Sequence, residues 1–181
     1  MDLDELRLDC AIKQKNGLHF ILASVVIWCA MIFVHASGLP ILTRNLLTFC
    51  CTAPLVPLAY LISKAIKVDF QNKANPLTNL GILFSVNQIL YLLIAMWVYP
   101  TVPEKMLMVI AMIFGAHLLP YGWLYRSKAY MAFSVAIPIA ALIVGSKYSA
   151  YTLAVMMTGI EIIFSVCLVL ENRRNLAKPA A

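Results

Sequence analysis

The chain has 181 residues, of which 62% are hydrophobic and 12% are charged, and its mean hydropathy is +0.86. A soluble domain of average composition has roughly 45–50% apolar and about 25% charged residues, so this composition excludes a soluble globular protein and indicates an integral membrane protein. The net charge of +6 does not indicate nucleic-acid binding, because the basic residues flank apolar runs and form no patch.

Residues 1–17 are charged, and their apolar side chains recur at roughly helical spacing. Acidic residues lie near the start, and Lys13 and Lys15 lie near the end, an order that the helix dipole favours. This pattern predicts an N-terminal interfacial amphipathic segment that ends at Gly17. The apolar run that follows is too long for a signal peptide and lacks its small-residue cleavage site, so we expect it to remain as a helix.

Six apolar runs follow, each close to the length of about 20 residues that one transmembrane helix needs. They predict an all-α integral membrane protein, with a single six-helix transmembrane domain over residues 18–171 and a polar, frayed tail over residues 172–181. The predicted helices are Leu18–Ser37, Thr43–Lys64, Leu77–Tyr99, Glu104–Tyr125, Lys128–Gly145 and Ala150–Leu170. Pro54 and Pro57 lie inside the second helix and predict a kink there, with the Thr48–Thr52 face turned inward.

Basic residues are divided unequally between the two ends of this bundle. With both termini on one side, eleven lie on that side and three on the other. The eleven are Arg7, Lys13, Lys15, Lys64, Lys67, Lys73, Arg126, Lys128, Arg173, Arg174 and Lys178, and the three are Arg44, Lys105 and Lys147. The positive-inside rule therefore predicts that both termini are cytoplasmic.

Four polar side chains are predicted to lie in one slab near the centre of the membrane. Glu161 and the Asn87–Gln88 pair are roughly 15 Å from the inner ends of their helices, and His117 is roughly 12 Å from the inner end of its helix. Ionisable groups at this depth usually face a protein interior or a wet cavity, which makes Glu161 and His117 candidate functional residues. We expect Glu161 to face the interior, within reach of His117 or the Asn87–Gln88 pair.

Polar neighbours at helical spacing extend these faces. Thr158 lies one turn from Glu161, Tyr91 one turn from Gln88, and Tyr121 one turn from His117. The predicted ligand-binding residues are therefore Glu161, His117, Gln88, Asn87, Tyr91, Tyr121 and Thr158. Amides and hydroxyls also hold membrane helices together, at about 0.6 kcal/mol per hydrogen bond, so a purely structural role stays open.

Neither a metal site nor a cofactor site is predicted. His19 and His35 lie near the two ends of the first helix, where we expect them to be interfacial, and His117 lies on the fourth helix at another depth. This spread excludes a zinc triad and a bis-histidine haem. Four of the five cysteines lie in apolar runs, where we interpret them as small packing residues.

The stretches Asn16–Ser24, Arg44–Cys50 and Gly115–Tyr130 carry a resemblance to a known family. They resemble a bacterial family of small six-helix membrane proteins classified only as a domain of unknown function. The resemblance covers nearly the whole chain and implies a multi-pass protein of the bacterial cytoplasmic (inner) membrane. Size and topology are also similar to substrate-binding subunits of energy-coupling-factor vitamin transporters, although those carry alanines four apart on the first helix, and here the spacings are seven and six.

These features favour a small transporter or solute-binding membrane protein with a polar midplane site for a small polar or amphipathic solute. Glu161 would be its proton-responsive carboxylate, and His117 would be the partner of Glu161. An intramembrane enzyme with these two residues as an acid–base pair is an alternative, but no nucleophile or metal set completes it. A non-catalytic structural or interaction protein is a third hypothesis. The expected partners are the lipid bilayer and the solute, with a homo-oligomer as an option and no nucleic acid.

Overall fold

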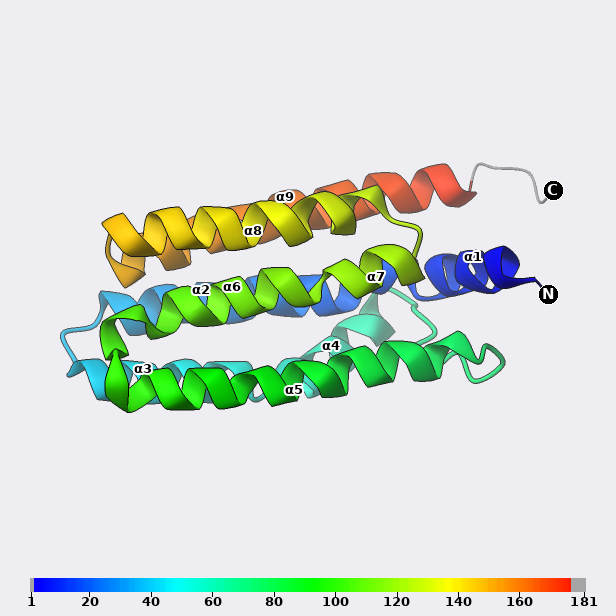
Figure 1. Cartoon of the computed structure of the whole chain (residues 1–181). Helices are drawn as coiled ribbons and strands as arrows, with labels where there is room; N and C mark the ends of the chain where they lie inside the picture. The colour runs from blue at the N-terminus through cyan, green and yellow to red at the C-terminus, as the bar shows by residue number, and fades with distance from the viewer. Residues whose placement is uncertain (1, 177–181) are drawn as a thin grey trace.

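The computed structural model describes residues 2–176, which form an all-α bundle (Figure 1). Its α-helices are α1 (Leu3–Lys13), α2 (Leu18–Ala36), α3 (Ile41–Thr52), α4 (Leu55–Ala65), α5 (Leu77–Thr101), α6 (Met106–His117), α7 (Leu119–Leu124), α8 (Lys128–Lys147) and α9 (Ala150–Leu176), and its short 3₁₀ turns are η1 (Lys15–Gly17) and η2 (Pro103–Lys105). Within the described residues, five helical segments are long and apolar enough to cross a membrane, and a sixth is added if α3 and α4 form one bent span. The all-α class is confirmed, and the spans are consistent with a multi-pass bundle in contact with a lipid bilayer.

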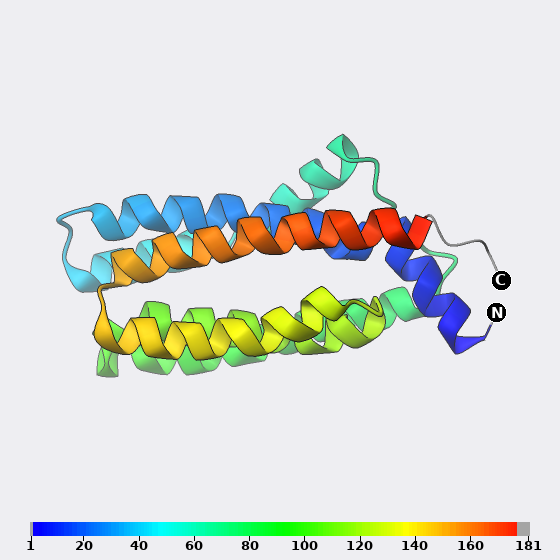
Figure 2. The same ribbon diagram turned by 90° about the horizontal axis from the view of Figure 1, so that it is seen from above.

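The long helices lie in two rows (Figures 1 and 2). One row holds α9, α2 and the α3–α4 segment, and the other holds α8, α6 and α5. The most extensive packing is between α2 and α9 and between α6 and α8, and contacts between α8 and α9 join the two rows. Trp28, Ile137 and Phe164 belong to the buried apolar cluster along these contacts.

The predicted kink in the second span is confirmed. Helix α3 ends at Thr52, α4 begins at Leu55, and their axes differ by 40°. Pro54 and Pro57 have no N–H to donate, so the regular hydrogen-bond ladder cannot continue through this segment. Thr48 is buried and contacts His35, as expected of an inward-facing residue, whereas Thr52 is half-buried.

Helix α4 packs on α2 after this bend, whereas α5 packs mainly on α6 and α7. As a result α5 is the least buried of the spans, with only 11% of its most apolar window buried inside the protein. Most large apolar side chains of α5 are therefore left to face lipid. The side of α5 turned toward α6 and α7 contributes to the interior, and near its end Tyr99 packs on Phe49 of α3.

Helix α1 lies across the ends of α5, α7 and α9 (Figure 1). Since α1 and the last turns of α9 meet there, we call this end of the bundle the terminal end. Cys10 and Ala11 are fully buried in this contact. Asn172 donates a hydrogen bond to the carbonyl oxygen of Lys15 at 2.8 Å. The interfacial placement of residues 1–17 relative to a membrane stays a prediction.

Helix α9 continues six residues beyond its predicted end at Leu170. Glu171 explains the extension, since its carboxylate accepts hydrogen bonds from the Ser127 hydroxyl (2.5 Å) and the Ala129 N–H (2.9 Å) and so anchors the last turns of α9 to the start of α8. The remainder of the predicted tail, residues 177–181, lies outside the described residues.

Candidate solute-binding pocket

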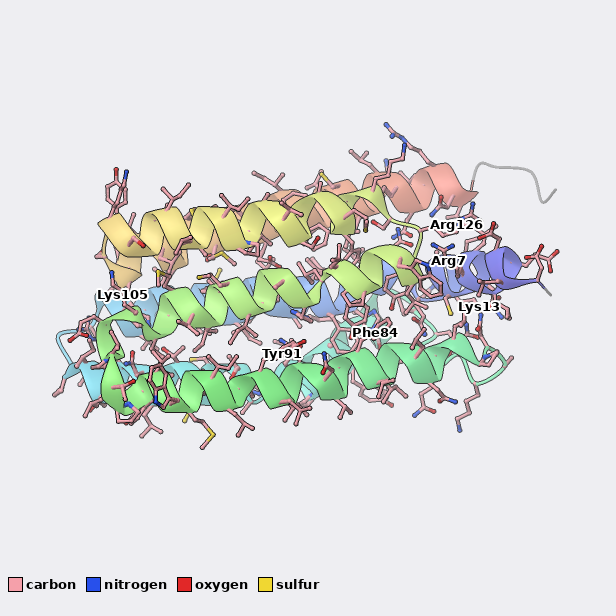
Figure 3. All side chains as sticks on the ribbon, viewed as in Figure 1. Arg7, Lys13, Phe84, Tyr91, Lys105 and Arg126 are labelled. Atoms are coloured by element: carbon pink, nitrogen blue, oxygen red, sulfur yellow. The ribbon has the colours of Figure 1, made fainter. Side chains whose placement is uncertain are left out.

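A pocket of about 130 Å³ lies between α5 and the junction of α6 with α7. In Figure 3, Phe84 and Tyr91 lie on the side of α5 that faces α6. The residues that line the pocket are Phe84, Asn87, Tyr91, Ala116, His117 and Pro120. Three of the seven predicted ligand-binding residues therefore surround one cavity, and apolar side chains complete its wall.

The junction of α6 and α7 places His117 at this pocket. Pro120 has no N–H, so the helical hydrogen bond to the carbonyl of Ala116 cannot form, and Leu118 instead donates to Gly115 O at 3.1 Å. The chain tightens at this turn, and α6 ends at His117. Regular helix resumes at Leu119 in α7.

The ring of His117 is oriented by a short contact of 2.5 Å between its Nδ1 and the carbonyl oxygen of Phe114. A carbonyl oxygen only accepts, so Nδ1 carries the proton, and in the neutral ring Nε2 is left as an acceptor. Among residues 2–176 no side chain or backbone group hydrogen-bonds to Nε2. His117 therefore offers the pocket an acceptor.

Two residues of α5 supply the remaining polar atoms. Asn87 Nδ2 donates to the hydroxyl of Tyr91 at 3.0 Å, which leaves the hydroxyl proton of Tyr91 and Oδ1 of Asn87 available. Tyr121 packs its ring against that of His117, with 6.0 Å between centroids, but its hydroxyl is engaged by Ser85 (2.7 Å) and Gly81 O (3.1 Å). Tyr121 thus supports His117, and its hydroxyl is already used in joining α7 to α5.

Glu161 is buried in the protein interior, as predicted, but its predicted partners are wrong. The carboxyl is 0% exposed, and its Oε2 lies 2.5 Å from the hydroxyl of Ser24 on α2. No hydrogen bond or ion pair joins it to His117 or to the Asn87–Gln88 pair in the described part of the chain. Sequence spacing gives depth along a helix but not which helices are neighbours, and here α9 packs on α2 while α5 lies beyond α6 in the other row.

The remaining predicted site residues lie apart from the pocket. Thr158 is beside Glu161 on α9, and its hydroxyl donates to its own helix at Ala154 O (2.9 Å). Gln88 is half-buried on α5, and among residues 2–176 its side chain makes no hydrogen bond. Ser24 was missed by the sequence reasoning, because one serine in a long apolar run carries no signal that distinguishes the α9-facing side of its helix.

Protein covers both His19 and His35, and their interfacial placement relative to a membrane stays a prediction. His19 is 2% exposed, and its ring lies 5.3 Å from that of Phe70, a residue of the loop before α5. His35 is 7% exposed and shares a hydrogen bond of 3.0 Å with Thr48 of α3. Both residues do lie at helix ends, but neighbouring segments fold over them, which the pattern of a single helix cannot reveal.

Comparison with known proteins places the chain in a family. Residues 3–171 match a family described as a family of unknown function, DUF7010. Neither the curated proteins nor the solved structures contain a match to the chain.

Proposed function

We propose that this chain, which belongs to DUF7010, a family of unknown function, is a solute-binding membrane protein that holds a small amphipathic solute in the pocket between α5 and the α6–α7 junction. The observation that supports this most directly is the free acceptor of His117, held by Phe114 and turned to a pocket inside a membrane-embedded bundle. Ionisable residues at such depth mark solute or ion sites by default. A location in the bacterial cytoplasmic (inner) membrane and a transport activity are parts of this proposal.

The lining of the pocket defines the chemistry of the solute. His117 Nε2 and Asn87 Oδ1 accept hydrogen bonds, Tyr91 can donate one, and Phe84 and Pro120 supply apolar surface. The six lining residues include no lysine, arginine, aspartate or glutamate, and an uncompensated charge in such a site is costly. The solute that fits best is neutral, carries a hydroxyl or amide N–H that donates to His117, and has a small apolar part.

Thermal unfolding of the detergent-solubilised protein tests this proposal with a panel of short alcohols and primary amides and their matching carboxylates. Ligand that binds the folded state raises the unfolding temperature by mass action, so we expect an alcohol or amide, but not its carboxylate, to stabilise the wild type. Tyr91→Phe should weaken the apparent affinity about threefold to tenfold, the usual effect of one lost hydrogen bond. His117→Ala should remove the stabilisation.

The matched control is Leu90→Ala, a truncation at a 60% exposed position on the outer side of α5 that should bind like the wild type. Equal stabilisation of His117→Ala and the wild type, or no effect of any panel member on the wild type, would contradict the proposal. Uptake of the identified solute into proteoliposomes, absent for His117→Ala, would establish transport in addition to binding.

A further inference from the structure

Glu161 is an ionisable residue that the solute pocket does not use. Its carboxyl is fully buried where α9 packs against α2, and its buried Oε1 atom has no hydrogen-bond partner in the described part of the chain. Among residues 2–176, no lysine, arginine or histidine forms an ion pair or hydrogen bond with it. A charged carboxylate in this position would lack any compensating charge, which is unfavourable inside a protein and more so inside a membrane.

The two contacts of the Ser24 hydroxyl indicate whether the carboxyl group of Glu161 is protonated. Ser24 Oγ lies 2.7 Å from the carbonyl oxygen of Ile21 and 2.5 Å from Glu161 Oε2. The serine hydroxyl has one proton, and a carbonyl oxygen can only accept. If Ser24 donates to Ile21, the second short contact is a hydrogen bond only when Glu161 Oε2 carries a proton and donates it to Ser24.

The groups that surround Glu161 on the neighbouring helices supply no other proton donor. Thr158 and Ser165, on α9 itself, donate to backbone oxygens, those of Ala154 (2.9 Å) and Glu161 (2.8 Å). From α8, the phenol of Tyr130 is close enough for an electrostatic interaction with Glu161 but makes no hydrogen bond to it. From α2 the polar contact is Ser24, and the ring proton of His117 on α6 is donated from Nδ1 to the carbonyl oxygen of Phe114.

We propose that Glu161 is a proton-binding site in the α2–α9 interface: it holds a proton on Oε2 at neutral pH and donates it to Ser24, and release of that proton forces this interface to rearrange. The rearrangement follows because the ionised form has no hydrogen-bond donor for Oε1 and no countercharge among the described residues. This inference is independent of the solute pocket, which shares no residue with the site.

Infrared spectroscopy of the purified protein tests the protonation state. We expect a carbonyl stretching band of a neutral carboxylic acid at neutral pH that disappears in Glu161→Gln. Ser24→Ala should keep the band but shift its frequency, because the acid loses its acceptor. Ser165→Ala is the matched control, since that hydroxyl bonds only the backbone oxygen of Glu161, and it should leave the band in place. The absence of any band that Glu161→Gln removes would overturn the proposal.

Thermal unfolding of the wild type and Glu161→Gln, compared in the same detergent from about pH 5 to about pH 9, provides a second readout. The amide can donate to Ser24 as the acid does, so this variant should fold. A solvated glutamate ionises above about pH 4.3, whereas the folded chain keeps its proton, so the unfolding equilibrium constant of the wild type should rise relative to Glu161→Gln by up to about tenfold per pH unit. A stability difference that does not change with pH would overturn the proposal.

Discussion

Asp9 on α1 connects this helix to the loop before α5. Its carboxylate accepts hydrogen bonds from Nδ2 of Asn72 (3.0 Å) and of Asn75 (2.8 Å) and pairs with Lys13 Nζ at 2.6 Å. Burial raises the pKa of Asp9, but the hydrogen bonds from Asn72, Lys13 and Asn75 together outweigh it, so the pKa lies below the ordinary 3.8. The ionised form is therefore the one that stabilises the terminal end.

The lowered pKa of Asp9 predicts a loss of stability in acid. Above the ordinary pKa the folded and unfolded chains are both ionised and the stabilisation is complete, and it is lost as the pH falls below about 4 and through the folded-state pKa. At neutral pH, Asp9→Asn should lower the free energy of unfolding by about 1–3 kcal/mol, because it leaves partly buried donors unpaired. Thermal unfolding from about pH 7 to about pH 3 should show the difference from the wild type narrowing in acid.

Asp4→Asn is the control for that series, since the side chain of Asp4 is 62% exposed and its ion pair with Arg7 lies at the surface. Exposed ion pairs contribute about 0–1 kcal/mol, so this variant should resemble the wild type at every pH. A difference between Asp9→Asn and the wild type that stays constant down to about pH 3 would contradict the role assigned to Asp9.

Single residues also define the limit of what the sequence predicts about the candidate site. His117 and Asn87 were predicted because polar groups at membrane depth are rare, and Tyr91 because it lies one turn from Gln88; all three line one pocket. The burial of Glu161 was predicted for the same energetic reason. The contact of Glu161 with Ser24 was not predicted, because a hydroxyl in an apolar helix is too common to indicate a partner.

At the scale of elements, the contact between α6 and α8 depends on a glycine. A Cβ atom at Gly115 would lie 2.5 Å from Pro138 Cδ and 2.6 Å from Ile137 Cγ2, and a proline ring cannot move aside as a flexible side chain can. Gly115→Ala should therefore destabilise the protein by about 1–3 kcal/mol through overpacking, measured as a lowered unfolding temperature in detergent.

Two further glycines are matched controls for that substitution. Gly145→Ala is the positive control, because a Cβ atom there would lie 2.5 Å from Cγ and 2.7 Å from Cβ of Met108, and no rotamer change moves that Cβ, so it should also destabilise the contact between α6 and α8. At Gly159 on α9 no atom lies within 4 Å of the added carbon, and Gly159→Ala should be neutral or stabilising by up to about 1 kcal/mol. Equal unfolding temperatures for Gly115→Ala and Gly159→Ala would show that α6 and α8 do not pack as closely as described.

Helix positions follow from the sequence better than helix contacts do. Four long helices begin at their predicted residues, because each apolar run has a clear polar or proline boundary. The bend after Thr52 was predicted from Pro54 and Pro57, which cannot donate to the helical ladder. The end of α9 at Leu176 was not predicted, because the hydrogen bonds that Glu171 accepts from Ser127 and Ala129 depend on tertiary structure.

At the scale of the whole molecule, the arrangement of the long helices in two rows has no signature in the sequence. In water a buried helix face is recognised by its apolar residues, but lipid is as apolar as a protein core, so this signal is lost. Helix α5 illustrates the difficulty, because it is strongly apolar and yet mostly exposed. The expected pair of Glu161 and His117 is wrong for this reason, since two residues at one depth can belong to different rows.

The charge distribution along the bundle supports the last prediction, which concerns its orientation in the membrane. Arg7, Lys13 and Arg126 lie at the terminal end, and Lys105 lies at the opposite end (Figure 3). The positive-inside rule predicts that the terminal end faces the cytoplasm. Asn72 is a poor place for a probe, since it is buried and donates to Asp9, but Lys73 beside it and Ser146 at the other end are exposed.

Single cysteines at these two exposed positions, in a variant whose five native cysteines are replaced, test the orientation in intact cells. A membrane-impermeant thiol reagent should label Ser146→Cys from outside, and it should label Lys73→Cys only after the cells are opened. Both positions are exposed in the folded chain, so a difference in labelling reports the side of the membrane and not burial within the protein. Labelling of Lys73→Cys in intact cells, with Ser146→Cys protected, would reverse the orientation and place the terminal end, with its basic residues, outside the cytoplasm.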